Sequence, residues 1–171
     1  MSSQFIGAIG ERLVEADLLW SGWVPVNLNQ SIKMAPNIDV IAAKGAQKVA
    51  LQIKTAGPNS KSMVQLGYGG KGSVFNSKEG PIADFVIFVR LFDRMHHEFY
   101  VVPVNEAERV AQETYNEWLN TPKGDGSARA DKCPIVIRFE PNRNRMQVSN
   151  YKERWAHYRD AWHLLDISAR S

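Results

Sequence analysis

A carboxylate, an amide and an ammonium group lie within two otherwise apolar stretches of the sequence. Asp39 lies in the stretch 37–43, and Gln52 and Lys54 lie in the stretch 48–54. Burying such groups costs free energy unless they pair with one another or bind something else. The residues therefore indicate one of two arrangements: a buried ion pair of Asp39 with Lys54 beside a hydrogen-bonded Gln52, or a site that holds a ligand.

The two stretches form a predicted β-hairpin, because residues 44–47 (Lys-Gly-Ala-Gln) are typical of a tight turn. Symmetrical pairing about the centre of that turn places Asp39 opposite Gln52. Side chains alternate between the two faces of a strand, so Gln52 and Lys54 share one face and lie roughly 7 Å apart. The spacing therefore predicts that all three polar groups lie together on one face of the hairpin.

A second carboxylate belongs to the first predicted helix. Glu11 shares a helical face with Gly7, Val14 and Leu18, because these residues lie three, four or seven positions from it. Gly7 would let the helix approach a sheet closely, which directs Glu11 inward. The alternative is that Gly7 and Gly10 only loosen the start of the helix and that Glu11 pairs with a neighbouring base.

Positive charge is unevenly distributed along the chain, although the formal net charge is only +3. No acidic residue lies between Asp39 and Glu79, and a second basic bias covers 138–159. The first stretch contains six lysines: Lys44, Lys48, Lys54, Lys61, Lys71 and Lys78. Such stretches could face phosphates, and the alternative is a solvated lysine surface. The last three lysines belong to a Gly- and Ser-rich loop that directly follows Lys54, and with Lys44 they are the candidates for contact with nucleic acid.

The remaining pattern predicts one domain in which a mixed sheet is flanked by helices. Helices are expected over 3–20, 105–119 and 150–165. Strands are expected over 23–26, 37–43, 48–54, 84–92, 98–104, 134–139 and 146–148. Loops are expected over 27–36 and 57–80, the second with a short element near 64–66. Asn105 and Asn150, each with a glutamate three residues on, are the expected N-caps of the last two helices. Trp155, Tyr158 and Trp162 are spaced as a core or interface stripe on the final helix.

Composition excludes several other classes of protein. With 171 residues, 44% of them hydrophobic and 23% charged, the chain is globular in composition rather than disordered. No stretch approaches the roughly 20 apolar residues of a membrane helix, and the N-terminus lacks the features of a secretion signal. The single cysteine, Cys133, cannot form an internal disulfide or a multi-cysteine zinc site. We expect a reduced, cytoplasmic, single-domain protein.

Four short motifs, in the order in which they occur, resemble those of the PD-(D/E)xK nuclease superfamily. They are Gly10-Glu11-Arg12 in the first helix, Gly22-Trp23 before the first strand, Asn37-Ile38-Asp39-Val40, and Leu51-Gln52-Ile53-Lys54-Thr55. The sequence looks most like the branch in which Gln replaces the second acid, seen in Mrr-like restriction nucleases and some homing endonucleases, and its layout is similar to that of archaeal Holliday junction resolvases. The resemblance implies a restriction-endonuclease-like α/β core over 5–104 and leaves 105–171 as an extension of unassigned role.

The resemblance also implies a role for each polar residue of the hairpin and the first helix. Asp39 would be the central metal ligand, and Gln52, Glu11 and the carbonyl of Ile53 would complete the metal site. Lys54 would orient or help to deprotonate the attacking water and stabilise the charged phosphate. Phosphodiester hydrolysis near neutral pH needs a divalent ion, and Mg²⁺, with Mn²⁺ as a substitute, accepts such oxygen ligands.

The expected function is therefore metal-dependent hydrolysis of DNA phosphodiester bonds by an endonuclease. An enzyme that cuts both strands would use one site per strand, so we expect a homodimer or a higher homo-oligomer. Gln52 removes one negative charge from the site, which leaves a catalytically silent nucleic-acid-binding protein as one alternative. A nuclease that acts on RNA or on branched DNA is the other.

Overall fold

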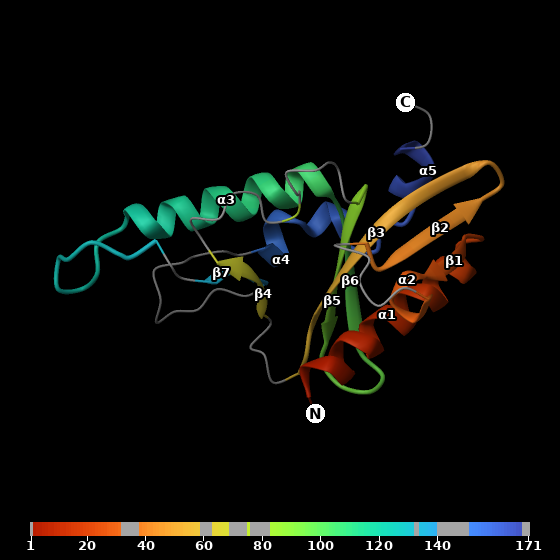
Figure 1. Ribbon diagram of the computed structural model, residues 1–171, viewed down its shortest axis with the longest axis horizontal. Coiled ribbons are helices and arrows are strands. Elements are labelled where there is room, and N and C mark those ends of the chain that lie inside the picture. The colour runs from red at the N-terminus through yellow and green to blue at the C-terminus, as the bar shows by residue number, and fades with distance from the viewer. Residues whose placement is uncertain are drawn as a thin grey trace.

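The computed structural model describes residues 2–31, 38–58, 63–68, 75, 83–131, 134–139 and 151–168. A mixed five-stranded sheet lies at the centre, with helices on both of its faces and a separate two-stranded sheet (Figure 1). The strands are β1 (Val24–Asn27), β2 (Val40–Lys44), β3 (Gln47–Ala56), β4 (Met63–Tyr68), β5 (Phe85–Leu91), β6 (His97–Pro103) and β7 (Pro134–Arg138). The helices are α1 (Ser3–Trp20), α2 (Leu28–Ser31), α3 (Val104–Asn120), α4 (Tyr151–Arg154), a 3₁₀ turn (Ala156–Tyr158) and α5 (Leu164–Ser168).

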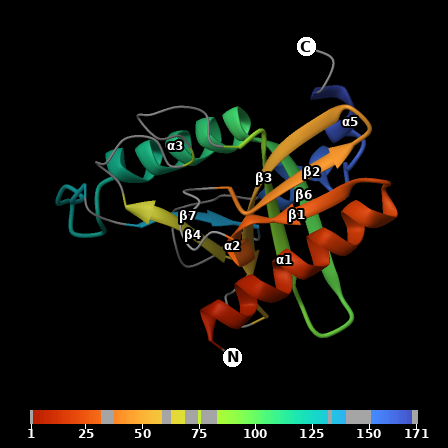
Figure 2. The ribbon, with the colours of Figure 1, turned by 45° about the vertical axis from the view of Figure 1, so that its right-hand side comes forward.

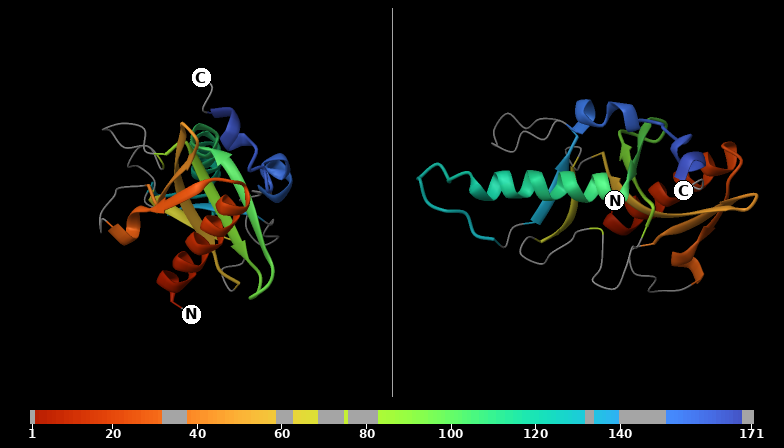
Figure 3. Two further views of the ribbon diagram at one scale, coloured as in Figure 1. Left: turned by 90° about the vertical axis from the view of Figure 1, so that its right-hand side faces the viewer. Right: turned by 90° about the horizontal axis from the view of Figure 1, so that it is seen from above.

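The five-stranded sheet has the order β1-β2-β3-β5-β6. β3 and β5 run parallel, and the other neighbouring pairs are antiparallel. Every residue of β5 is buried, as expected for a strand covered on both faces. β4 and β7 form the smaller antiparallel sheet beside α3, at the opposite end of the molecule from the β2–β3 turn (Figure 3).

The hairpin formed by β2 and β3 has the predicted register. Pairing runs from Val40 opposite Leu51 to a turn at Gly45 and Ala46. Gly45 has a φ of 60°, a left-handed value that favours glycine. Beyond Leu51, β3 continues to Ala56 without a β2 residue beside it. In that part of the strand, the edge of β3 that faces β2 pairs with no other strand among the described residues.

Helix α1 spans the predicted residues and packs along one face of the five-stranded sheet (Figure 2). Its Val14 and Leu18 belong to a hydrophobic cluster that also contains Leu51 and Ile53 of β3. Because side chains alternate along a strand, the even-numbered residues of β3 in this region lie on the face away from α1.

The close approach of α1 to the sheet depends on Gly10 and not on Gly7, which corrects the expectation from the sequence. A β-carbon at Gly10 would lie 1.9 Å from Oγ1 of Thr55, whereas one at Gly7 would meet nothing within 4 Å. The helical phase explains the difference, since Gly10, Val14 and Leu18 recur every four residues and are the buried residues of α1. Glu11 therefore lies at the side of the buried face.

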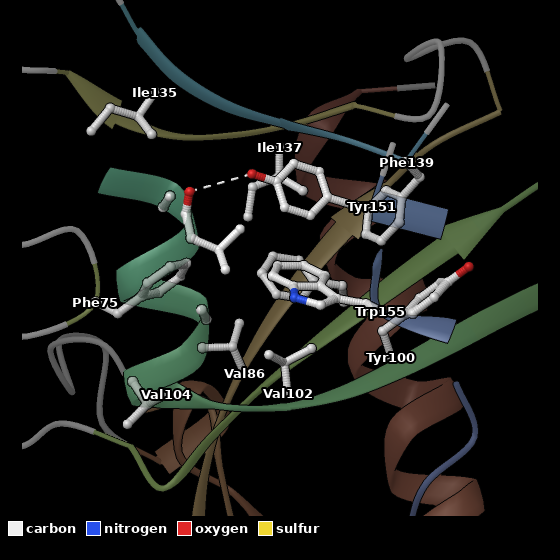
Figure 4. Close-up of a cluster of buried hydrophobic side chains, with 14 of the residues drawn as sticks. Phe75, Val86, Tyr100, Val102, Val104, Ile135, Ile137, Phe139, Tyr151 and Trp155 are labelled. Atoms are coloured by element: carbon white, nitrogen blue, oxygen red, sulfur yellow. Dashed lines mark hydrogen bonds between the residues drawn. The ribbon is translucent and has the colours of Figure 1, made fainter. Parts of the chain in front are cut away.

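The opposite face of the sheet is covered by α3, β7 and the C-terminal segment (Figure 4). Trp155 is fully buried there and stacks on Phe88 of β5, with ring centroids 5.2 Å apart. Tyr151 packs against Trp155, and its hydroxyl hydrogen-bonds to that of Thr114 on α3. The described part of the extension 105–171 thus contributes to the hydrophobic core.

The prediction of a single helix over 150–165 is wrong. α4 ends at Arg154, a 3₁₀ turn follows, and Asp160 adopts a left-handed φ of 51°. Trp155 belongs to the cluster beside α3, whereas Trp162 packs against the cluster beside α1. The two tryptophans therefore fill different cores, and their helix-like spacing does not reflect one helical face.

Two local expectations also differ from the structure. Asn105 is not a cap, because α3 begins at Val104, whose N–H donates to the carbonyl of Asp84, and Pro103 occupies the N-cap position. The expected loop over 27–36 contains α2. The expected strand over 146–148 and the cap at Asn150 lie outside the described residues.

Among the helices that are described, none combines the length and apolar character needed to cross a membrane.

Candidate functional site

Two carboxylates from distant parts of the chain meet at one asparagine. Nδ2 of Asn29, in α2, donates to Oε1 of Glu11 and to Oδ1 of Asp39, each at 3.0 Å. The two acceptor oxygens therefore lie within about 6 Å of each other. Glu11 comes from α1 and Asp39 directly precedes β2, so the fold brings together the two acids that the sequence singles out. Their like charges repel, and the shared amide offsets part of that repulsion.

The position of Asp39 is fixed where the β2–β3 ladder ends. Its N–H donates to the carbonyl of Leu51 at 2.9 Å, and its carbonyl accepts from the N–H of Leu28 at 2.9 Å. Its Oδ2 accepts from the backbone N–H of Ile53 at 2.6 Å. The carboxylate thus provides the acceptor that a β2 carbonyl would provide if the ladder continued.

Glu11 is held from its other side by Asn27, the last residue of β1. Asn27 is buried, and its Nδ2 donates to Oε2 of Glu11 at 2.9 Å and to Oε1 of Glu15 at 2.6 Å. The nearby base, Arg12, pairs with Glu15 at 2.6 Å. Within the described part of the chain, the hydrogen bonds of Glu11 come from amides and not from a basic side chain, so the alternative role as a partner of a base is not supported.

Gln52 and Lys54 lie on the face of β3 away from α1. Gln52 is only 3% exposed, and its Oε1 has no hydrogen-bond partner in the parts of the chain that are described. The side chain of Lys54 is half-buried and likewise forms no hydrogen bond or ion pair with a described residue. A buried amide oxygen without a partner is costly, which makes it a candidate for contact with a ligand.

The structure therefore joins Glu11 and Asp39 but does not join them to Gln52 or Lys54 by direct hydrogen bonds. The buried Asp39–Lys54 ion pair considered from the sequence is absent, because the Asp39 carboxylate bonds to Asn29 and to the N–H of Ile53 instead. Gln52 and Lys54 belong to the part of β3 that extends beyond β2, and Asp39 bonds to the backbone of that part at Ile53.

The donor atoms at this place are oxygens. Two carboxylates and an amide oxygen suit magnesium, whereas zinc sites use histidine and cysteine more often. No group of three or more His, Cys, Asp and Glu residues is arranged to hold a metal ion among the residues that the structure describes. A cation here would therefore need amide or backbone oxygens in addition to the two acids.

Of the lysines predicted to bind nucleic acid, the one that the structure describes, Lys44, is not part of this cluster. Lys44 is the last residue of β2 and lies about 16 Å along the strand from Asp39. Its Nζ pairs with Oδ1 of Asp166 at 3.0 Å, and the side chain is still 40% exposed. Lys61, Lys71 and Lys78 lie outside the described residues.

Asn27 and Asn29 are members of the cluster that the sequence analysis missed. Both fall in the stretch expected to be a loop, and the one available signal is an Asn-Leu-Asn sequence directly after a short strand. Their acidic partner Glu11 lies 16 and 18 positions away. Such contacts depend on how α1 packs against β1, which the spacing of residues does not reveal.

The chain is similar over nearly its whole length to a solved nuclease structure. The match is to the bacterial homing endonuclease I-Ssp6803I, with a TM-score of 0.53 over 98% of this chain and 94% of that chain, at 16% sequence identity. The fold is nuclease-like. The mixed five-stranded sheet with flanking helices thus confirms the expected fold class.

Other comparisons add little to this result. The solved structure of MepB covers 93% of this chain at 12% identity with a TM-score of 0.34, a likeness too low to support a structural argument. No family model and no curated protein matches the sequence. Sequence identity of this order shows the fold alone, so the resemblance to the PD-(D/E)xK superfamily stays a prediction.

Proposed function

We propose that this protein is a metal-dependent endonuclease that hydrolyses phosphodiester bonds of DNA. The observation that carries the proposal is the convergence of Glu11 and Asp39 on one amide at the open edge of β3. Carboxylate oxygens that converge in this way suit a divalent cation. The nuclease-like fold and its likeness to a homing endonuclease support DNA as the substrate.

The residues at this edge fit Mg²⁺, or Mn²⁺ in its place. Glu11 and Asp39 each direct one oxygen to a common point, and Oε1 of Gln52 is a buried oxygen without a described partner. The N–H and C=O of one strand residue point to the same side, so Ile53, whose N–H bonds to Asp39, directs its carbonyl to the same edge. A bound cation would supply the Lewis acid that polarises the phosphate and generates hydroxide near neutral pH.

The protein's own groups hold and orient the reacting atoms. The N–H of Ile53 and the amide of Asn27 fix the two carboxylates in advance, which lowers the cost of assembling the site. Lys54 supplies an ammonium two residues after Gln52 on the same face of β3. Its three donors can contact both an attacking water and a phosphate oxygen, and its charge stabilises the negative charge that develops.

The acid-free stretch of chain around β3 would hold the DNA backbone near the site. Its lysines lie before, within and after β3 in the sequence. Neutralisation of phosphates by such residues supplies most of the sequence-independent affinity for DNA. We further propose that a homodimer or higher homo-oligomer cuts the two strands, with one site acting on each. Light scattering of the protein with and without duplex DNA tests this part.

A nicking assay on supercoiled plasmid tests the proposed activity. Wild type, Lys54→Ala and Lys123→Ala are compared with Mg²⁺, with Mn²⁺ and with EDTA. Lys123 is the matched control because it is an exposed lysine in the loop after α3. We expect metal-dependent nicking by wild type and the control, and a loss of about 100-fold or more in Lys54→Ala. Equal nicking by both variants, or no cleavage by wild type of plasmid, duplex, branched or single-stranded DNA, would contradict the proposal.

Gln52 favours one alternative, a protein of nuclease-like fold that binds nucleic acid without cutting it. An amide in place of an acid removes one negative charge and weakens the attraction for a divalent cation. Calorimetric titration with Mn²⁺ separates the two functions, because the proposed enzyme binds Mn²⁺ and Asp39→Ala abolishes that binding. A silent protein would bind DNA but no Mn²⁺. Adding RNA to the substrate panel distinguishes a ribonuclease from both.

A further inference from the structure

We propose that Asn29 takes the place of the cation in the metal-free protein and that an incoming cation must displace it. Asn29 is in this view a positioning residue of the metal site, and it competes with the metal for the same two carboxylates. The inference rests on the proposed function, because it concerns how that site is occupied before metal binds.

The geometry of the Asn29 amide carries the argument. One nitrogen atom, Nδ2, lies 3.0 Å from Oε1 of Glu11 and 3.0 Å from Oδ1 of Asp39. A side-chain amide nitrogen carries two protons, so it can give one to each acid. Hydrogen bonds to ionised acceptors are the stronger kind, and this pair offsets the repulsion between the two carboxylates, as a bound cation would.

The remaining oxygen of each carboxylate has an anchor that does not involve Asn29. Oε2 of Glu11 accepts from Nδ2 of Asn27, and Oδ2 of Asp39 accepts from the N–H of Ile53. The two acids therefore keep their positions when Asn29 leaves. The oxygens that Asn29 holds are the ones directed to the common point between α1 and the start of β2.

Asn29 is also placed so that it can leave. Its side chain is exposed and belongs to α2, a single helical turn, whereas Asn27 is buried at the end of β1 and bonds to α1. Movement of Asn29 therefore opens no hydrophobic core. Asn29 can therefore release the two carboxylates while the buried Asn27 still holds Glu11 in place.

A consequence for metal affinity follows from this competition. Cation binding must break both Asn29 hydrogen bonds. The apparent affinity for the cation is therefore the intrinsic affinity multiplied by the fraction of molecules in which Asn29 has left the site. Removing the amide should remove this competition without loosening the carboxylates. Magnesium should then bind more tightly to the variant than to wild type, which is the opposite of what loss of a metal ligand would produce.

The test is calorimetric titration of the full-length protein with Mg²⁺ alone, without DNA. Asn29→Ala is compared with wild type and with Asn116→Ala, a matched control at an exposed position of α3. We expect Mg²⁺ to bind Asn29→Ala roughly tenfold more tightly than wild type, and the control to match wild type. In EDTA the midpoint of thermal unfolding should fall in Asn29→Ala, and saturating Mg²⁺ should close most of that gap. Asn29→Leu, which keeps side-chain bulk, should behave as Asn29→Ala does.

Three other outcomes overturn the inference in distinguishable ways. Equal Mg²⁺ affinity in wild type and both Asn29 variants would show that Asn29 only supports the structure. Weaker affinity in the variants would show that Asn29 is itself a ligand. In both cases the proposed function stands if Asp39→Ala still abolishes binding. Absence of Mg²⁺ binding by wild type and by every variant would remove the inference together with the proposed metal site.

Discussion

Gly10 of α1 lies directly against Thr55 of β3. A β-carbon on Gly10 would come within 1.9 Å of Thr55 Oγ1 and within 3.0 Å of two of its carbon atoms. Glu11 is the next residue of the helix, so this contact sets how closely Glu11 approaches the edge of β3. A packing contact of the residue next to Glu11 thereby helps to determine the geometry of the candidate site.

Gly10→Ala is expected to lower the free energy of unfolding by about 1–3 kcal/mol, the usual cost of overpacking a well-filled interior. Gly7→Ala is the matched control on the same helix and should stabilise by roughly 0.5–1 kcal/mol, because its β-carbon meets nothing and alanine favours helix. Urea denaturation of both variants measures the difference. Combining Gly10→Ala with Thr55→Ala should recover part of the loss, and equal destabilisation by the two glycine variants would refute the packing account.

Asp39→Asn should abolish most of the proposed cleavage and leave DNA binding intact. The substitution keeps the shape of the side chain but removes the charge that a divalent cation requires. We expect the single-turnover rate with Mg²⁺ to fall by about 100-fold or more, since even residues that only support metal ligands cost 10- to 100-fold. Affinity for duplex in EDTA should be unchanged or higher, because one negative charge is gone. A parallel loss of DNA affinity would mean that Asp39 acts in folding and not in chemistry.

Tyr151 makes stability sensitive to alkaline pH. Burial raises the pKa of its hydroxyl from 10.0 to about 12. Between these two values the unfolded chain releases the proton while the folded protein keeps it, so the stability contributed by the neutral hydroxyl is complete below pH 10 and is lost as pH rises toward 12. Urea midpoints of Tyr151→Phe should decline less steeply than those of wild type across this range. Parallel profiles would show that other groups govern the alkaline loss.

Affinity for duplex DNA should depend steeply on salt. If four to six of the lysines in the acid-free stretch contact phosphates, the log–log slope of binding against salt is roughly −4 to −5. Lys44→Gln should make the slope shallower by about one. Asp166→Asn is its control, because it removes the ion-pair partner of Lys44 but keeps the lysine. Fluorescence anisotropy of a labelled duplex gives both slopes, and a flat dependence would leave these lysines as solvated surface.

The parts of the fold that local chemistry determines could be predicted from the sequence. The β2–β3 register follows from the turn at Gly45 and from alternation on either side, and α1 follows from its apolar spacing and the Ser21-Gly22 stop. These features depend on interactions between residues near one another in sequence, or on one strand pairing about one turn. The proximity of Glu11 and Asp39, which lie on distant elements, was expected only as an implication of the resemblance to a nuclease family.

The predictions that the structure contradicts concern features that depend on long-range packing. Trp155 has the spacing of a helix residue, but its contact with Phe88 and the bridge of Arg159 to Tyr100 give that segment a different path. The contact role given to Gly7 belongs to Gly10, because the spacing alone does not say which side of α1 meets the sheet. Asn29 was missed because its two partners lie on elements that only the folded structure brings together.

The parallel pairing of β3 with β5 has a consequence for how this protein can change over evolutionary time. The side chains that define the site all precede Ala56, whereas the connection 57–84 leaves β3 beside that site and returns at Phe85. Loop closure becomes costlier only slowly with length, by about 0.6 kcal/mol for each doubling. β4 and the buried Phe75 constrain parts of this connection, but insertions between them carry little penalty. The connection can therefore change in length while the residues of the candidate site keep their places.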